Sequence, residues 1–189
     1  MHDQAIVFLH GGWGKVAAAG STQYAIDRWQ PKRIINLGTC GGFSGHVERG
    51  TLILAQKTII YDIIEQMKGA AQAIEKYSVD FDLSWIPDPP PQPVQVGTLL
   101  SADRDILAGD IPVLVEKYQA AVADWESGAI AWVCSRNNVP CLILRGVSDL
   151  VDVQTGEAYG DYAFFEAQSQ SIMTDLVQHL PAWLQAFSI

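Results

Sequence analysis

Residues 5–38 read "AIVFLHGGWGKVAAAGSTQYAIDRWQPKRIINLG", and the expected architecture follows from them. The apolar run 5–10 ends in two glycines, which is typical of a buried strand. Residues 14–29 have the composition of a helix that ends before Pro31, because proline cannot continue it. A second apolar run, 33–38, indicates another buried strand. Strand, helix and strand in this order predict an α/β fold with a parallel or mixed sheet covered by helices.

The rest of the chain continues the alternation. A glycine-rich turn is expected at 39–45, and a final helix has apolar residues at helical spacing from Ile172 to Phe187. The prolines at 87, 89, 90, 91 and 93 predict an extended surface loop at about 84–93. We expect one domain, 1–189, built as a three-layer α/β sandwich with a central mixed sheet. The further predicted strands are 50–62, 94–101, 120–126 and 140–149, and the further helices are 63–76, short pieces within 103–118, and 127–138.

Composition excludes several classes of protein. The formal net charge of -9 disfavours nucleic-acid binding, which needs a basic face. No apolar stretch approaches the roughly 20 residues of a membrane span, and the N-terminus lacks the basic region of a signal peptide. The histidines are scattered, so no metal site is expected. Cys40, Cys134 and Cys141 are an odd number in apolar contexts, which predicts buried free thiols in a reducing cytoplasm.

Unusual residues follow three of the apolar segments. Ligands of open α/β sheets bind beyond the carboxyl ends of strands, so the turns expected after Gly38, Trp125 and Val147 are candidate walls of a site. The "LGTCGGFSG" stretch at 37–45 could bring backbone amides close to a ligand. It lacks the glycine spacing of dinucleotide-binding and phosphate-binding loops, and so does "HGGWGK" at 10–15.

Two carboxyl groups stand out beside these segments. Asp149 ends an apolar strand; it is either a turn or helix cap, or a desolvated acid that can donate a proton. Glu126 is either a first-turn glutamate facing a helix N-terminus, or a carboxylate that accepts hydrogen bonds from ligand hydroxyls. Trp125 is either a core aromatic or a surface on which a sugar or base packs. A carboxylate acceptor and a carboxylic acid together suit cleavage of a glycosidic bond.

Four segments carry a resemblance to a known family. The chain resembles the nucleoside phosphorylase/nucleosidase family over residues 5–62 and 94–152, and most closely its 5′-methylthioadenosine/S-adenosylhomocysteine nucleosidase branch. The resemblance implies a nucleoside phosphorylase-like fold. In chain order the segments are "GWGKVAAA", "RIINLGTCGGF", "GTLILAQKTIIYD" and "VADWESGAIAWVCSRNNVPCLILRGVSDLVD".

The resemblance implies roles for individual residues. Asp149 would protonate a purine leaving group at N7, and Glu126 would bind the ribose hydroxyls. No cofactor or metal is implied, and members of the family pair as homodimers. Six further residues would line the substrate pocket or support it: Thr39, Cys40, Gly41, Trp125, Arg145 and Ser148.

The choice between hydrolysis and phosphorolysis rests on one segment. Many purine phosphorylases of the family have a phosphate-binding arginine before the glycine-rich turn, where this chain has Asn36 and Leu37. Hydrolysis is therefore favoured. The resemblance begins after the family's first strand and its water-activating glutamate, so a nucleoside-binding relic and a truncated family member stay open as alternatives. Glu48, Asp62 and Glu157 are the carboxylates that could replace that glutamate.

Overall fold

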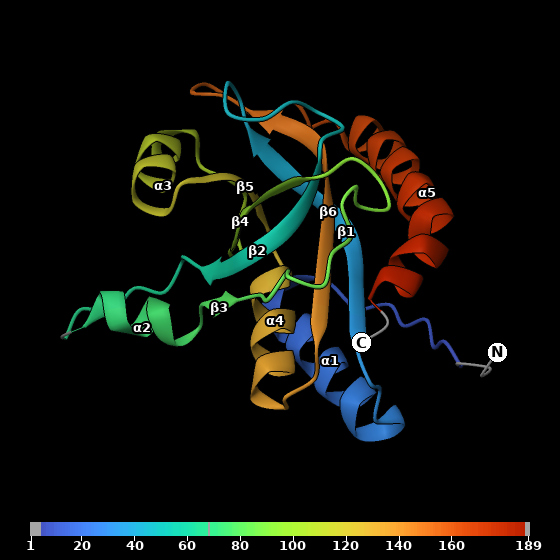
Figure 1. The fold of residues 1–189 in the computed structure, drawn as a ribbon. Helices are drawn as coiled ribbons and strands as arrows, with labels where there is room; N and C mark the ends of the chain where they lie inside the picture. Colours follow the sequence, from blue (N-terminus) through green and yellow to red (C-terminus); the bar gives the residue numbers. More distant parts are fainter. Residues whose placement is uncertain (1–4, 68, 188–189) are drawn as a thin grey trace.

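A computed structural model describes residues 5–67 and 69–187, so the ends of the predicted domain lie outside the described residues. Its strands form one mixed sheet with helices on both faces (Figure 1). No helix in this part of the chain is both long and apolar enough to cross a membrane. In chain order the elements are α1 (Gly14–Trp29), β1 (Ile34–Phe43), β2 (Leu52–Ile60), α2 (Ala70–Lys76), β3 (Val79–Asp80), β4 (Gln95–Ser101), η1 (Ala108–Asp110), α3 (Ile111–Tyr118), β5 (Ala120–Asp124), α4 (Ser127–Arg136), β6 (Cys141–Val151) and α5 (Tyr162–Ala186).

The strand order is β3-β2-β4-β5-β1-β6, with a further pairing between β2 and β6. β1 runs parallel to β6, and β4 runs parallel to both β2 and β5. These two groups meet in antiparallel pairings, β1 with β5 and β2 with β6, so the sheet curls back on itself. The predicted central mixed sheet is therefore confirmed.

Helices α4 and α5 cover opposite faces of β6. Leu142 and Leu144 pack in one apolar cluster with Leu176 and Trp183 of α5. Ile143, which points to the other face as alternation requires, shares a cluster with Ala131 of α4. Figure 1 shows α5 along β1 and β6 on one side, and α1 beside α4 on the other.

The predicted strand at 5–10 is wrong. These residues are irregular and exposed, with Ile6 at 53% and Phe8 at 75% of their full accessibility. No strand among the described residues pairs with them. An apolar run becomes a strand only when a neighbour satisfies its backbone groups, so composition alone misled the prediction.

The predicted turn at 39–45 is also wrong for most of its length, because β1 continues to Phe43. Gly41 and Gly42 pair with β6 on one side and β5 on the other. A Cβ at Gly42 would lie 2.6 Å from Val47 and 2.7 Å from Val147. Glycine is required here by close packing inside a sheet and not by a turn.

The helix at 14–29 is confirmed with the predicted bounds. The helix expected at 63–76 is shorter, Ala70–Lys76, and residue 68 lies outside the described residues. The stretch 84–93 has neither helix nor strand, as its prolines predict.

Candidate functional site

The two predicted carboxyl groups flank β1 near its C-terminal end. Asp149 in β6 pairs with Gly41, and Gly41 pairs on its other side with Ala123 near the end of β5. Glu126 follows β5 after Trp125 and immediately precedes α4. The turns expected after Gly38 and Val147 do not exist, because these residues lie inside β1 and β6. The candidate site therefore lies near the carboxyl ends of β1, β5 and β6, with Glu126 just beyond the end of β5.

Asp149 is buried, with 6% of its surface exposed. Burial raises the pKa of its carboxyl group, the nearby charges of Glu157 and Asp105 add to this, and a hydrogen bond from Ser148 opposes it. Gly41 lies beside this carboxyl, since a Cβ there would lie 3.8 Å from Asp149 Oδ2. The balance favours a carboxyl group that holds a proton more readily than a solvated aspartate.

Ser148 can orient Asp149 in both protonation states. Its Oγ lies 2.6 Å from Asp149 Oδ1 and 3.2 Å from the carbonyl oxygen of Cys40. A hydroxyl has one proton, so Ser148 donates to ionised Asp149, and can turn to the carbonyl when Asp149 is protonated. The Cys40 thiol beside it is buried, and burial raises its pKa. Cys40 is therefore a neutral wall residue and not a nucleophile.

Glu126 is held by the N-terminus of a different helix from its own. Its Oε1 accepts a hydrogen bond from Gly14 N at the start of α1, at 3.0 Å. The first amides of α4 are served by Asp124, whose Oδ1 accepts from Ser127 N at 3.1 Å. Burial raises the pKa of Glu126, while the Gly14 amide opposes the shift. The carboxylate is thus fixed between α1 and α4, at the edge of the candidate site.

Trp125 is paired with Trp13, a residue that the sequence analysis did not identify. The ring centroids are 5.7 Å apart and the planes tilt by 44°. Trp13 is 78% exposed, and Gly14, which binds Glu126, follows it directly. The pair forms an aromatic surface beside the carboxylate. The sequence signal for Trp13 was its place in a glycine-rich stretch, residues 10–15, that matches no phosphate-binding motif.

Arg145 lies beneath the site in a buried network. Its Nε is 2.8 Å from Asp124 Oδ2, with 3% and 2% of the two side chains exposed. Its Nη2 donates to Asn36 at 2.6 Å, and Ser101 Oγ donates to Asp124 at 2.6 Å. The network ties β1, β4, β5 and β6 together. Thr39 is half-buried in β1 and pairs with Gly146, one residue after Arg145.

A tyrosine that the sequence analysis missed holds Ile106, which lies beside Asp149. Tyr159 Oη donates to the Ile106 carbonyl at 2.7 Å. Ile106 in turn reaches over Gly41, where a Cβ would lie 2.7 Å from its Cδ1. Burial raises the pKa of Tyr159 to about 12, with Asp105 and Asp149 adding to the shift. Ile106, which Tyr159 holds by its carbonyl, therefore covers one side of the carboxyl group.

The three carboxylates considered as water-activating groups have different surroundings. Asp62 forms an ion pair with Lys15 Nζ and accepts from Asp103 N at 3.0 Å. Glu157 accepts from Leu150 N at 2.9 Å and pairs with Arg49. Glu48 is exposed. Asp62 lies nearest to the start of α1, because Lys15 follows the glycine that binds Glu126.

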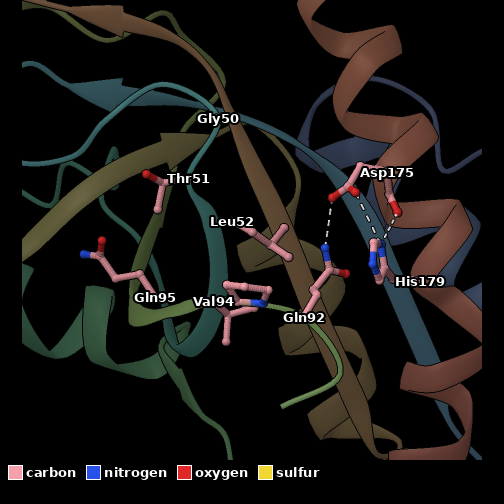
Figure 2. Close-up of a pocket in the computed structure, with 9 residues that line it drawn as sticks. Gly50, Thr51, Leu52, Gln92, Val94, Gln95, Asp175 and His179 are labelled. Carbon is pink, nitrogen blue, oxygen red and sulfur yellow. Dashed lines mark hydrogen bonds and ion pairs between the residues drawn. The ribbon is translucent and has the colours of Figure 1, made fainter. Parts of the chain in front are cut away.

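A surface hollow of about 430 Å³ lies away from this site. Figure 2 shows Gln92, Asp175 and His179 on one wall, with Thr51 and Gln95 across from them. Gln92 already donates to Asp175 at 3.0 Å and accepts from Trp183 at 2.8 Å. These contacts fasten the proline-rich loop to α5. Asp175 also lies 3.3 Å from His179 Nδ1, in a pair whose side chains are 56% and 40% exposed to solvent. The residues that line the hollow are Gly50, Thr51, Leu52, Gln92, Pro93, Val94, Gln95, Asp175 and His179.

Comparisons with known proteins agree with this architecture. The family model of the phosphorylase superfamily matches residues 2–181. The 5′-methylthioadenosine/S-adenosylhomocysteine nucleosidase of Buchnera aphidicola is 30% identical over 171 residues, which cover 80% of this chain and 69% of that protein. Among solved structures, the futalosine hydrolase of Helicobacter pylori has a TM-score of 0.74 at 18% identity, covering 93% of this chain and 77% of that one. The 5′-methylthioadenosine nucleosidase of Arabidopsis thaliana has a TM-score of 0.74 at 21% identity, covering 94% and 71%.

Proposed function

The chain belongs to the phosphorylase superfamily, and from that premise we propose that it hydrolyses the N-glycosidic bond of a purine nucleoside of the methylthioadenosine or S-adenosylhomocysteine type. Its matched relatives are nucleosidases, which supports nucleoside hydrolysis. The observation that carries the proposal is the setting of Asp149. It is a buried carboxyl group whose pKa is raised by burial and whose orientation is held by a hydroxyl.

Asp149 is proposed as the general acid. A purine leaves the ribose as an anion unless it gains a proton, so protonation at N7 turns a poor leaving group into a neutral one. The ribose is left as an oxocarbenium-like species that water attacks. Ser148 supports this step, because it can follow Asp149 between its protonated and ionised forms. A raised pKa keeps more of the acid in the protonated form near neutral pH.

Glu126 is proposed to bind the ribose hydroxyls. The hydrogen bond from Gly14 N at the start of α1 holds the carboxylate still, which reduces the entropy lost when substrate binds. Trp125 and Trp13 provide an aromatic surface for the sugar and its 5′ substituent. Thr39, Cys40 and Gly41 would line the pocket between Glu126 and Asp149. Arg145 would act from below by fixing Asp124.

Hydrolysis fits the charges better than phosphorolysis. Phosphate would need an uncommitted cation, and the guanidinium of Arg145 is neutralised by Asp124 and also bonded to Asn36.

We also expect a homodimer, because large apolar side chains beside the site are exposed. Phe8, Trp13 and Val16 are 75%, 78% and 86% exposed, and a second copy would cover them. Light scattering on the purified chain measures this directly.

The test compares turnover with binding in matched variants. Asp149→Asn should lower kcat by roughly 10²–10⁴-fold, the usual contribution of a general acid, while calorimetry shows substrate affinity within a few-fold of wild type. Glu126→Gln should weaken binding by about 10- to 100-fold, because it removes charged hydrogen bonds. Asp27→Asn, an exposed position on α1, is the control. Full activity of Asp149→Asn would refute the assignment. Binding without turnover in the folded wild-type protein would favour the relic.

A further inference from the structure

Two of the three cysteines lie together, away from Asp149 and Glu126. Cys134 is near the end of α4 and Cys141 is the first residue of β6, whereas the two carboxyl residues lie at the other ends of these elements. Cys141 packs against the apolar cluster that contains Cys134. The two thiols are in hydrogen-bond contact with each other. The pair is therefore a dithiol whose sulfur atoms are neighbours in space although seven positions separate them in sequence.

This dithiol opens on a surface hollow of about 320 Å³ that both cysteines line. Cys134 is fully buried and Cys141 is partly exposed, so solvent reaches the pair through Cys141. The walls are mainly apolar, and the rings of Trp85 and Phe187 lie 4.5 Å apart in them. The hollow can therefore hold a small apolar group next to the sulfur atoms.

The surroundings keep the Cys141 thiol neutral. The described residues that line the hollow include no lysine, arginine or histidine, and they include Asp80 and Asp82. The hydrogen bond with Cys134 and burial both raise the pKa of the Cys141 thiol. Reactions that need a free thiolate, such as oxidation by peroxide, are slow at such a site. A ligand for this pair must bond two sulfur atoms and remove their protons in the same reaction.

We propose that Cys134 and Cys141 form a two-sulfur site for uncharged trivalent arsenic compounds of the arsenoxide class. In the reaction both S–H bonds and the arsenic–oxygen bond break, two As–S bonds form, and the oxygen leaves with the two protons as water. No electron is transferred, so no oxidant or reductant is needed. Arsenic(III) is a soft centre that prefers sulfur, in line with the preference of thiolates for soft ions. The organic group on arsenic would occupy the apolar hollow.

The adduct would also join α4 to β6. Two As–S bonds close a loop from 134 to 141, which restricts the unfolded chain as a disulfide does. Binding to two sulfurs held together in the folded state should therefore raise the Tm. This effect is independent of the proposed nucleosidase activity, so failure of one proposal leaves the other standing.

The experiment uses phenylarsine oxide on the whole chain in excess 2-mercaptoethanol, which removes arsenic held by a single thiol. Intact mass should show one phenylarsenic group on wild type and on Cys40→Ala, and none on Cys134→Ala or Cys141→Ser. The Tm should rise only where the group is bound, and 2,3-dimercaptopropanol should reverse both effects.

Three results would overturn the proposal. They are no adduct on folded wild type, an adduct that persists on Cys141→Ser, and an adduct that requires Cys40. If Cys134→Ala fails to fold, Cys141→Ser decides alone, because its partly exposed position tolerates a hydroxyl.

Discussion

Replacing Arg145 by methionine should destabilise the protein strongly. The substitution keeps much of the side chain's length but removes its charge, so the Asp124 carboxylate stays buried without its cation. The two side chains are only 3% and 2% exposed, and Nε lies 2.8 Å from Oδ2. The substitution also removes the donor to Asn36 at 2.6 Å. Both losses occur beneath the candidate site, where water cannot take the place of the guanidinium.

The size of the loss follows from this burial. Removing one partner of a buried ion pair typically costs about 3–5 kcal/mol. A domain of this length loses roughly 2–4 °C of Tm per kcal/mol, so the Tm should fall by roughly 6–20 °C. The control is Lys57→Met. Lys57 pairs with Asp80 at 3.2 Å, but the two side chains are 36% and 77% exposed. Its loss should cost below about 1 kcal/mol.

Urea denaturation of wild type, Arg145→Met and Lys57→Met at pH 7 measures the differences in the free energy of unfolding. The double variant Asp124→Asn/Arg145→Met removes both charges. It should be more stable than Arg145→Met alone, because no unpaired charge remains. If Arg145→Met lies within 1 kcal/mol of wild type, or if the double variant is the less stable of the two, the buried pair is not what the substitution disrupts.

Three further predictions concern the site and the sheet. Asp149→Asn should raise the free energy of unfolding at pH 7, because the raised pKa of Asp149 makes its ionised form unfavourable in the fold. Urea titrations should show this gain vanish below about pH 4, the ordinary pKa of an aspartate, where the carboxyl group is protonated in both states. Tyr159→Phe loses the 2.7 Å hydrogen bond to Ile106, worth about 1 kcal/mol, and the loosened Ile106 admits water to Asp149. The pKa of Asp149 should then fall, so the decrease of kcat with rising pH should move to lower pH. An unchanged pH profile would contradict the shielding of Asp149 by Ile106. Gly146→Ala would place a Cβ 2.3 Å from Ile172 and should cost about 1–3 kcal/mol in thermal melts, whereas Gly97→Ala, which meets nothing within 4 Å, should not.

Local sequence patterns predicted the elements that depend on local chemistry. The helix at Gly14–Trp29 and the loop at 84–93 follow from composition and from proline, and both occur. The failures depend on partners. Residues 5–10 have the composition of a strand but no neighbouring strand among the described residues. Gly41 and Gly42 suggested a turn, yet glycine is needed there because neighbouring side chains crowd β1.

The features of the candidate site also fall into those that local sequence suggests and those that depend on distant partners. Glu126 and Asp149 stand out as charges next to apolar segments, so sequence alone makes them candidates. The amide that fixes Glu126 belongs to Gly14, 112 residues earlier, and no spacing rule predicts this contact. Tyr159 likewise reaches a carbonyl 53 residues away. Contacts of this kind arise from the folding of the sheet, and therefore only the structure reveals them.

The most direct test of the proposed function is release of free base from methylthioadenosine, S-adenosylhomocysteine, adenosine, inosine and futalosine, each with and without phosphate. A nucleosidase with Asp149 as its acid should release base from at least one of them without phosphate, at a rate that phosphate does not raise, and Asp149→Asn should slow the release by roughly 10²–10⁴-fold. Release that requires phosphate, or no release by the folded protein from any of the five, would contradict the proposal.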